Sequence, residues 1–134
     1  MKAIQARMTK GLQKGSLIVA TDNSGARIVR IAGIKKIKSV KGRHLGCGVG
    51  DWVKVSVRKG DPEMKGKVFD AVIVRQKKPY RRLNGERICF TDNAVVLLKD
   101  EKGNPKGTQV KGVVPREIAE RWKEVAKIAI GGVV

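Results

Sequence analysis

A short cationic segment between two apolar runs carries the clearest chemistry in this sequence. It contains no acid, and its side chains suited to nucleic-acid contacts are Lys77, Lys78, Tyr80, Arg81 and Arg82. The guanidinium groups of Arg81 and Arg82 can each donate two parallel hydrogen bonds to a phosphate, whereas lysine ammonium groups act as point charges. Tyr80 could stack on a base. The segment therefore predicts a surface that contacts nucleic-acid phosphates.

A second acid-free basic segment lies earlier, over residues 35–45, and glycines interrupt it. Its candidate phosphate contacts are Lys35, Lys36, Lys38, Lys41 and Arg43. Solvated surfaces usually mix both signs of charge, so five cations without one acid favour phosphate binding. A merely solvated loop is the alternative. Arg27, on the strand predicted before this loop, is a further candidate RNA contact.

The excess of positive charge extends well beyond these segments. The chain has 134 residues and a formal charge of +18, and its first 50 residues contain 11 lysines and arginines against one acid, Asp22. If about 8 cations each neutralise one phosphate, the slope of log affinity against log salt concentration is about −7 on a duplex. Aromatic residues make up only 4% of the chain. The composition therefore favours recognition of the backbone and shape of folded RNA over base-by-base reading.

Other chemistries find little support in the sequence. No nucleophile elbow, Walker motif or H-E-x-x-H motif occurs, so we expect no enzyme and no catalytic residue. Cys47, Cys89 and His44 could join Asp51 around zinc, but their spacing matches no known zinc site, and we expect free thiols, no metal and no cofactor. No secretory signal and no apolar run of 18 residues is visible, so we expect a cytoplasmic protein without a membrane partner.

Short strands are the elements that must position the basic segments. Apolar or alternating runs predict strands over residues 17–20, 26–34, 52–59, 68–74 and 94–98. Asn84-Gly85 predicts a type I′ hairpin turn directly after the cationic segment. The glycines of residues 46–51 could suggest a phosphate loop, but they precede an alternating strand rather than a helix, which favours a tight turn. Strands with glycine-rich turns indicate a small antiparallel β-barrel.

The end of the chain changes to a helical period. Ile118, Trp122, Val125 and Ala129 fall on one helical stripe behind Pro115, which suits a first helical turn. We therefore predict one domain over residues 1–134, with a basic arm over 1–15, the barrel over 16–114 and a C-terminal α-helix over 115–130. The arm is either a disordered tail or a segment that orders on a polyanion.

Several motifs resemble those of the universal large-subunit ribosomal protein fourteen family. The matching segments are Asp22-Asn23-Ser24-Gly25-Ala26-Arg27, Gly48-Val49-Gly50-Asp51 and Gly66-Lys67-Val68. The spacing from the apolar run 71–74 through Asn84-Gly85 to Phe90, Asn93, Val96 and Leu97 resembles the family signature. The resemblance covers roughly residues 16–129. The arm is longer than in bacterial members and resembles the archaeal and eukaryotic branch.

The resemblance implies a mainly β fold: a small closed five-stranded antiparallel barrel with a projecting basic β-ribbon and a C-terminal helix. It also implies a structural constituent of the large ribosomal subunit that binds 23S-type rRNA and contributes to intersubunit bridges with small-subunit rRNA. The implied protein neighbours are of the L-three and L-twenty-four-e types, and an anti-association factor would dock near the C-terminal segment. Candidate residues for that docking are Thr108, Gln109, Arg116, Glu117 and Arg121.

A free small-barrel nucleic-acid-binding protein is the alternative to a ribosomal role. Such an RNA chaperone or translation factor would bind single strands reversibly, and base stacking would keep its affinity at high salt. A structural ribosomal protein would instead show affinity that salt weakens steeply. The salt dependence of RNA binding therefore discriminates between the two classes.

Overall fold

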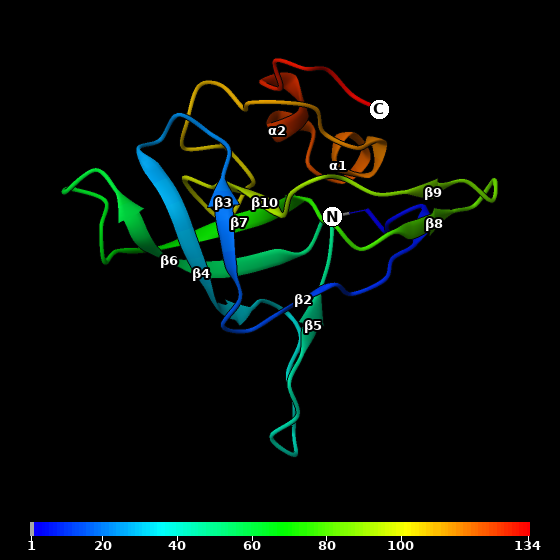
Figure 1. Cartoon of the computed structure of the whole chain (residues 1–134), viewed down its shortest axis with the longest axis horizontal. Helices are drawn as coiled ribbons and strands as arrows, with labels where there is room; N and C mark the ends of the chain where they lie inside the picture. Colours follow the sequence, from blue (N-terminus) through cyan, green and yellow to red (C-terminus); the bar gives the residue numbers. More distant parts are fainter. Residues whose placement is uncertain (1) are drawn as a thin grey trace.

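Five strands close into a β-barrel in the computed structural model, which describes residues 2–134 (Figure 1). In barrel order they are β10 (Ala94–Leu97), β3 (Leu17–Ala20), β4 (Ala26–Ile34), β6 (Trp52–Gly60) and β7 (Val68–Arg75). Four of the five pairings are antiparallel, and β10 closes the barrel by pairing in parallel with β3. The predicted fold class is confirmed, and the closing pair is its one parallel contact.

The pattern of apolar residues shows which side of the barrel is covered. On β6, Val53, Val55 and Val57 point into the barrel and are buried, while the residues between them are exposed or half-buried. On β7, by contrast, every residue from Ala71 to Arg75 is buried. Alternate residues of such a strand fill the barrel and the covered outer face, so both faces exclude water.

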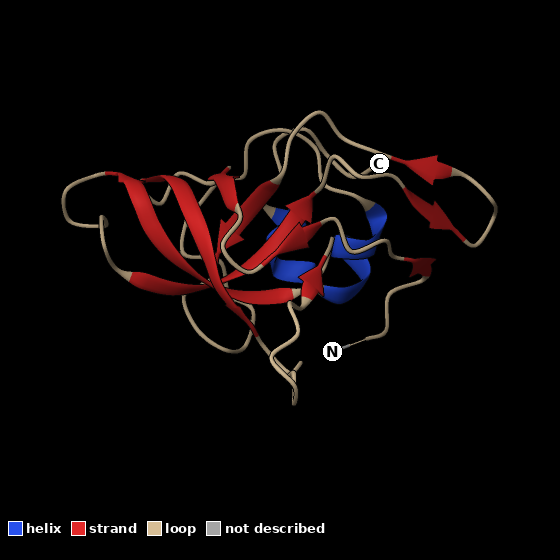
Figure 2. Cartoon of the chain, turned by 60° about the horizontal axis from the view of Figure 1, so that its bottom comes forward, coloured by secondary structure: helices blue, strands red, loops and turns tan. Residues whose placement is uncertain are grey.

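Two short helices cover this outer face: α1 (Arg116–Arg121) and α2 (Lys123–Lys127) (Figure 2). Ile118 and Val125 are fully buried there, in a second core separate from the barrel interior. The expected single helix over 115–130 is wrong, because Trp122 (φ −124°, ψ 71°) leaves the helical conformation. Its indole packs edge-on against Trp52, with ring centroids 6.2 Å apart, and Nε1 donates to the Gly50 carbonyl at 2.9 Å. This docking accompanies the break between the helices.

The N-terminal arm packs against the barrel rather than extending from it. Its strands are β1 (Ala6–Arg7) and β2 (Leu12–Gln13), and β2 pairs with β5 (Gly46–Cys47). Leu12 belongs to the barrel core, and Lys10 Nζ lies 2.8 Å from an Asp51 carboxylate oxygen. That same oxygen accepts the Gly48 N–H and stabilises the expected tight turn over 48–51. Met1, the first residue of the expected arm, lies outside the described residues.

The basic hairpin consists of β8 (Tyr80–Arg82) and β9 (Arg87–Ile88), which project to one side of the barrel (Figure 1). Its turn differs from the expected type I′, which needs positive φ at two successive central residues. Here only Gly85 has positive φ, and its N–H donates to the Arg82 carbonyl at 3.0 Å. This fits a type I turn followed by a left-handed glycine, the usual three-residue hairpin loop.

Two further expectations concern membranes and metals. Over residues 2–134, no helix has the length and apolar character needed to cross a membrane. In the same range, no group of three histidine, cysteine, aspartate or glutamate side chains is placed to hold a metal ion.

Candidate nucleic-acid interface

Three arginines lie side by side across the small sheet that contains the basic hairpin. Strand β1 pairs with β8 so that Arg7 faces Arg81, and β8 pairs with β9 so that Arg81 faces Arg87. Directly paired residues project to the same face of a sheet, and all three arginines are exposed. Strand spacing of about 4.8 Å makes this arginine row about 10 Å wide.

The arginine row is unfavourable in the free protein. Like charges directly opposite each other across a sheet destabilise it. Two unit charges about 5 Å apart repel by about 0.8 kcal/mol in water, and the flexible side chains reduce this by moving apart. No carboxylate pairs with Arg7, Arg81 or Arg87 among the described residues. A polyanion is the partner that would turn this repulsion into attraction.

The alternation of β8 turns two of the predicted RNA contacts inward. Tyr80 is fully buried and its hydroxyl donates to Glu117 Oε2 at 2.8 Å. Arg82 Nε donates to Glu117 Oε1 at 2.9 Å, and its Nη2 donates to the Val134 carbonyl at 2.8 Å. Burial and the bond to Glu117 raise the pKa of Tyr80, and the bond to Glu117 raises the pKa of Arg82. Tyr80 and Arg82 therefore fasten the hairpin to α1 and do not form its outer surface.

The other predicted cations of the hairpin region face solvent. Lys77, Lys78 and Arg81 are exposed, and no side-chain ion pair involves them within the described part of the chain. The Lys77 N–H donates to Asn93 Oδ1 at 2.8 Å, which fixes the backbone where β7 leads into the hairpin. Neither lysine side chain has a carboxylate partner within residues 2–134.

The second basic segment forms an irregular loop over residues 35–45 that projects from the barrel in another direction, downward in Figure 1. Its exposed cations are Lys36, Lys38, Lys41 and Arg43. Ser39 Oγ accepts the Arg43 N–H at 2.8 Å and closes the loop. Val40 at its tip is 95% exposed.

Lys35 anchors this basic loop instead of extending from it. Its Nζ lies 3.0 Å from Asp70 Oδ2 and 4.0 Å from the centre of the Trp52 ring. The side chain is only 18% exposed. Of the five cations predicted to bind phosphate in this segment, Lys35 is therefore engaged within the protein. Lys36 Nζ also lies 5.6 Å from the centre of the Trp52 ring, although its side chain is exposed, and Lys38, Lys41 and Arg43 have no ion-pair partner among the described residues.

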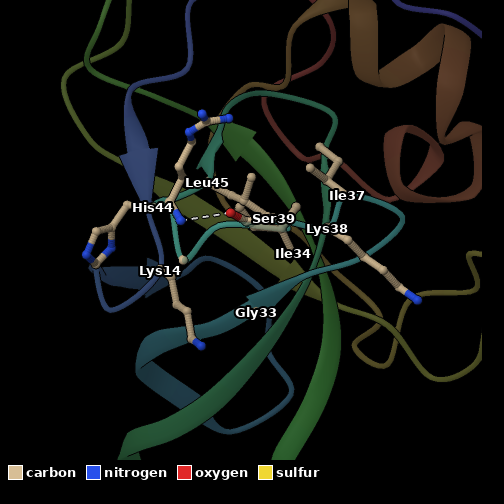
Figure 3. A pocket seen from close by; sticks show the side chains of 10 residues that line it. Lys14, Gly33, Ile34, Ile37, Lys38, Ser39, His44 and Leu45 are labelled. Carbon is tan, nitrogen blue, oxygen red and sulfur yellow. Dashed lines mark hydrogen bonds between the residues drawn. The ribbon is translucent and has the colours of Figure 1, made fainter.

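A hollow of about 510 Å³ lies between the basic loop and the barrel (Figure 3). The cations and histidine that line it are Lys14, Lys38, Arg43 and His44, and no carboxylate lines it. Figure 3 shows Lys14 and His44 on the side of the hollow opposite Ile37 and Lys38. A phosphate group entering this hollow would meet cations from the arm and from the loop.

The residues predicted for factor docking are also partly exposed and partly buried. Thr108 and Gln109 are exposed, and Asn23 Oδ1 accepts both of their N–H groups, at 2.7 and 3.2 Å. Arg116 is exposed on α1, and Arg121 is half-buried. Glu117 is 3% exposed and bound to the hairpin, so its side chain is not available to a docking protein.

The sequence prediction missed Arg7 and Arg87, the outer members of the arginine row. Arg87 could have been found, because Arg81 and Arg87 lie at equal distances from Asn84 and therefore face each other in the hairpin. Arg7 had no such signal, since only the docking of the arm places β1 beside β8. The remaining predicted contact, Arg27, is exposed on β4 at the far end of the barrel.

Comparison with known proteins gives a consistent match over nearly the whole chain. The family model described as "Ribosomal protein L14p/L23e" matches residues 11–132. Proteins named "Large ribosomal subunit protein uL14" from Halobacterium salinarum and Nanoarchaeum equitans are each 49% identical over 129 residues, 96% of this chain and 97% of theirs. The protein of that name from Haloarcula marismortui is 47% identical over the same coverage.

Proposed function

This chain belongs to the ribosomal protein L14p/L23e family, in its archaeal form, and is a structural protein of the large subunit of the cytoplasmic ribosome; we propose that it binds 23S-type rRNA through its arginine row and its basic loop. Family membership also supports the interpretation that the chain is not an enzyme. The observation that carries the proposal is the row of Arg7, Arg81 and Arg87, three like charges on one sheet face with no ion-pair partner within residues 2–134.

The arrangement of the aromatic residues supports backbone recognition. Trp52, Phe69 and Phe90 are half-buried, and Tyr80 and Trp122 are buried. A protein that stacks single-stranded bases presents exposed aromatic rings on a sheet, and residues 2–134 present no such row. The free RNA chaperone is therefore less well supported than a protein that neutralises the phosphates of folded RNA.

The rigid attachment of the hairpin supports the same proposal. A recognition surface works best when packed and hydrogen-bonded neighbours already hold it in place, because less conformational entropy is lost on binding. Glu117 holds Arg82 and Tyr80 on the inner face of β8, so Arg81 is presented between two paired strands. The inner residues thus position the outer ones.

The finer assembly roles follow from the family resemblance. We propose contacts with ribosomal proteins of the L-three and L-twenty-four-e types, a contribution to intersubunit bridges with small-subunit rRNA, and docking of an anti-association factor on the surface of Thr108, Gln109 and Arg116. These three residues are exposed. Subunit joining followed on sucrose gradients, with and without Arg116→Ala, tests the docking surface.

RNA binding is tested by removing part of the arginine row. The variant Arg81→Ala, Arg87→Ala should bind a large-subunit rRNA transcript more weakly, and its slope of log affinity against log salt should be smaller in magnitude by about 1.4–1.8, from roughly 0.7–0.9 per lost phosphate contact. Its thermal stability should stay equal or rise slightly, because repulsion in the free protein is relieved.

The control removes the same charge from a face that also carries acids. Lys102 and Lys123 are exposed near Glu120 and Glu124, so Lys102→Ala, Lys123→Ala should alter the slope much less. Equal slopes for the two double variants and the parent protein would contradict the role of the row. A parallel variant of the basic loop, with Lys36, Lys38, Lys41 and Arg43 changed to alanine, tests the second surface separately.

A further inference from the structure

Three hollows follow one another across the outer face of strands β3, β4 and β6. The first is the hollow beneath the basic loop, and a second of about 440 Å³ shares Lys14 and His44 with it. A third, of about 400 Å³, shares Gly15, Arg30 and Arg58 with the second. The shared lining residues make the three hollows one continuous track.

The track is cationic along its length. Its lining cations are Lys14, Arg30, Lys38, Arg43, Arg58 and Lys59. Among the described residues, no aspartate or glutamate lines any of the three hollows. Arg30 and Arg58 have no ion-pair or side-chain hydrogen-bond partner within residues 2–134, which leaves their guanidinium groups free for a ligand.

The strand register places these groups on one face. Leu17 faces Arg30 across β3 and β4, and Arg30 faces Ser56 across β4 and β6. The β4–β6 register shifts beside Arg58, but Ser56 and Arg58 both line the second hollow, so both contribute to this face. Leu17 is 64% exposed beside the arginines. The face combines unpaired guanidinium groups with an apolar floor.

The track also has the length of a short strand of RNA. Its lining on β4 runs from Ile34 beneath the loop to Ile28 at the far end, six residue-to-residue steps of roughly 3.3 Å each, or about 20 Å. Phosphates can pair with the arginines while ribose and base faces rest on the side chains of Leu17 and Ile28. A folded acidic protein would need carboxylates spaced along the same line.

We propose that this track binds the sugar-phosphate backbone of one further rRNA segment, which continues from the basic loop across the outer face of the barrel. The inference rests on the proposed function, since it extends rRNA binding to a surface that the two basic segments do not include. Continuity with the basic loop, which the proposed function assigns to RNA, favours RNA over protein as the occupant.

The test is Arg30→Ala, Arg58→Ala, measured on a large-subunit rRNA transcript over a range of salt concentrations. At about 0.1 M salt, each lost phosphate contact removes roughly fivefold in affinity, so the double variant should bind about 25-fold more weakly. The slope should fall in magnitude by about 1.4. Arg30→Lys, Arg58→Lys keeps both charges and should recover most of the affinity and of the slope. An unchanged melting temperature shows that the fold is intact.

A site-directed probe gives a second readout. Hydroxyl-radical cleavage from an iron chelate attached at Ser56→Cys, in a Cys89→Ser background, should cut rRNA in reconstituted large subunits at a defined segment. The same chelate at Lys123→Cys serves as the matched control and should not cut that segment.

The outcomes separate the two proposals. If Arg30→Ala, Arg58→Ala has the same RNA affinity and salt slope as Lys102→Ala, Lys123→Ala while the basic-loop variant loses affinity, the track proposal is overturned and the proposed function stands. If RNA affinity is unchanged but a neighbouring protein is lost from the reconstituted particle, the track is a protein contact and the proposal is also overturned. If variants of the track, the loop and the arginine row all bind like the parent, the proposed function fails as well.

Discussion

Replacing Glu117 with glutamine tests how the basic hairpin is held against the helices. Glu117 is 3% exposed, and its two carboxylate oxygens accept hydrogen bonds from Tyr80 and Arg82. The side chain of Arg82 is 8% exposed. Glu117→Gln keeps the volume of the side chain and one acceptor oxygen but removes its charge, so the buried Arg82 guanidinium loses its one side-chain counterion within residues 2–134. The Val134 backbone oxygen still accepts a hydrogen bond from Arg82 Nη2.

The expected loss of stability is large. Removing one partner of a buried ion pair costs roughly 3–5 kcal/mol, because the remaining charge is desolvated without compensation. We expect about 3 kcal/mol, since the Val134 carbonyl still accepts one bond. An unfolding entropy of about 2.1 cal/mol/K per residue gives about 0.28 kcal/mol/K for 134 residues, so the melting temperature should fall by about 11 °C.

Urea unfolding and thermal melts measure this loss, and Glu120→Gln is the matched control. Glu120 is half-buried on the same helix and takes part in no ion pair among the described residues. Amide hydrogen exchange over residues 80–88 should also accelerate in Glu117→Gln. Arg82→Met, Glu117→Met removes both charges and should recover part of the stability. A loss below about 1 kcal/mol, or one equal to that of Glu120→Gln, would refute this account of the hairpin.

Three further predictions concern the barrel and its thiols. Burial raises the pKa of Cys47 to about 12, so a thiol reagent at neutral pH should label the exposed Cys89 and leave Cys47 unmodified until the protein unfolds, which mass spectrometry can read. Burial also raises the pKa of Asp22. The contribution of the protonated Asp22 side chain to the free energy of unfolding is therefore fully present below the unfolded-state pKa and is lost as pH rises through the folded-state pKa. The free energy of unfolding of Asp22→Asn minus that of the parent should therefore be larger at pH 7 than at pH 4 in urea titrations; the opposite order would contradict the burial argument. Ile73→Ala should lower the free energy of unfolding by about 2–5 kcal/mol, because Ile73 is fully buried in the barrel core, and a loss under 1 kcal/mol would show a loosely packed core.

Much of the fold could be predicted because its local patterns are strong. The alternation of Val53, Val55 and Val57 predicted a strand with one face in a core, and the structure has this strand as β6. The continuous apolar run from Ala71 predicted barrel wall, and its lack of alternation is explained by the helices that cover β7. The Asn84-Gly85 pair located the hairpin, although its turn type was wrong. Each of these signals depends only on residues close together in the chain.

The candidate surface was predicted less completely, because charge alone does not say which way a side chain points. Lys77, Lys78 and Arg81 are exposed, but Arg82 and Tyr80 turn inward to Glu117, 35 and 37 residues away. The two-residue alternation of a strand would have placed the Arg81 side chain on the opposite face of β8 from Tyr80 and Arg82. This alternation could not have identified Glu117 as their hydrogen-bond partner, since the position of α1 beside the hairpin depends on packing between distant segments.

The sequence by itself determined the chemistry of this protein: a strongly cationic chain with acid-free segments, short strands and no catalytic motif, whose composition calls for a polyanionic partner. Only the tertiary structure decided which cations share a surface. Closure of the barrel lines up Lys14, Arg30 and Arg58 along one face, and docking of the arm sets Arg7 beside Arg81. The physical reason is that charge is a property of each residue, whereas a binding surface depends on long-range pairing, which local sequence does not encode.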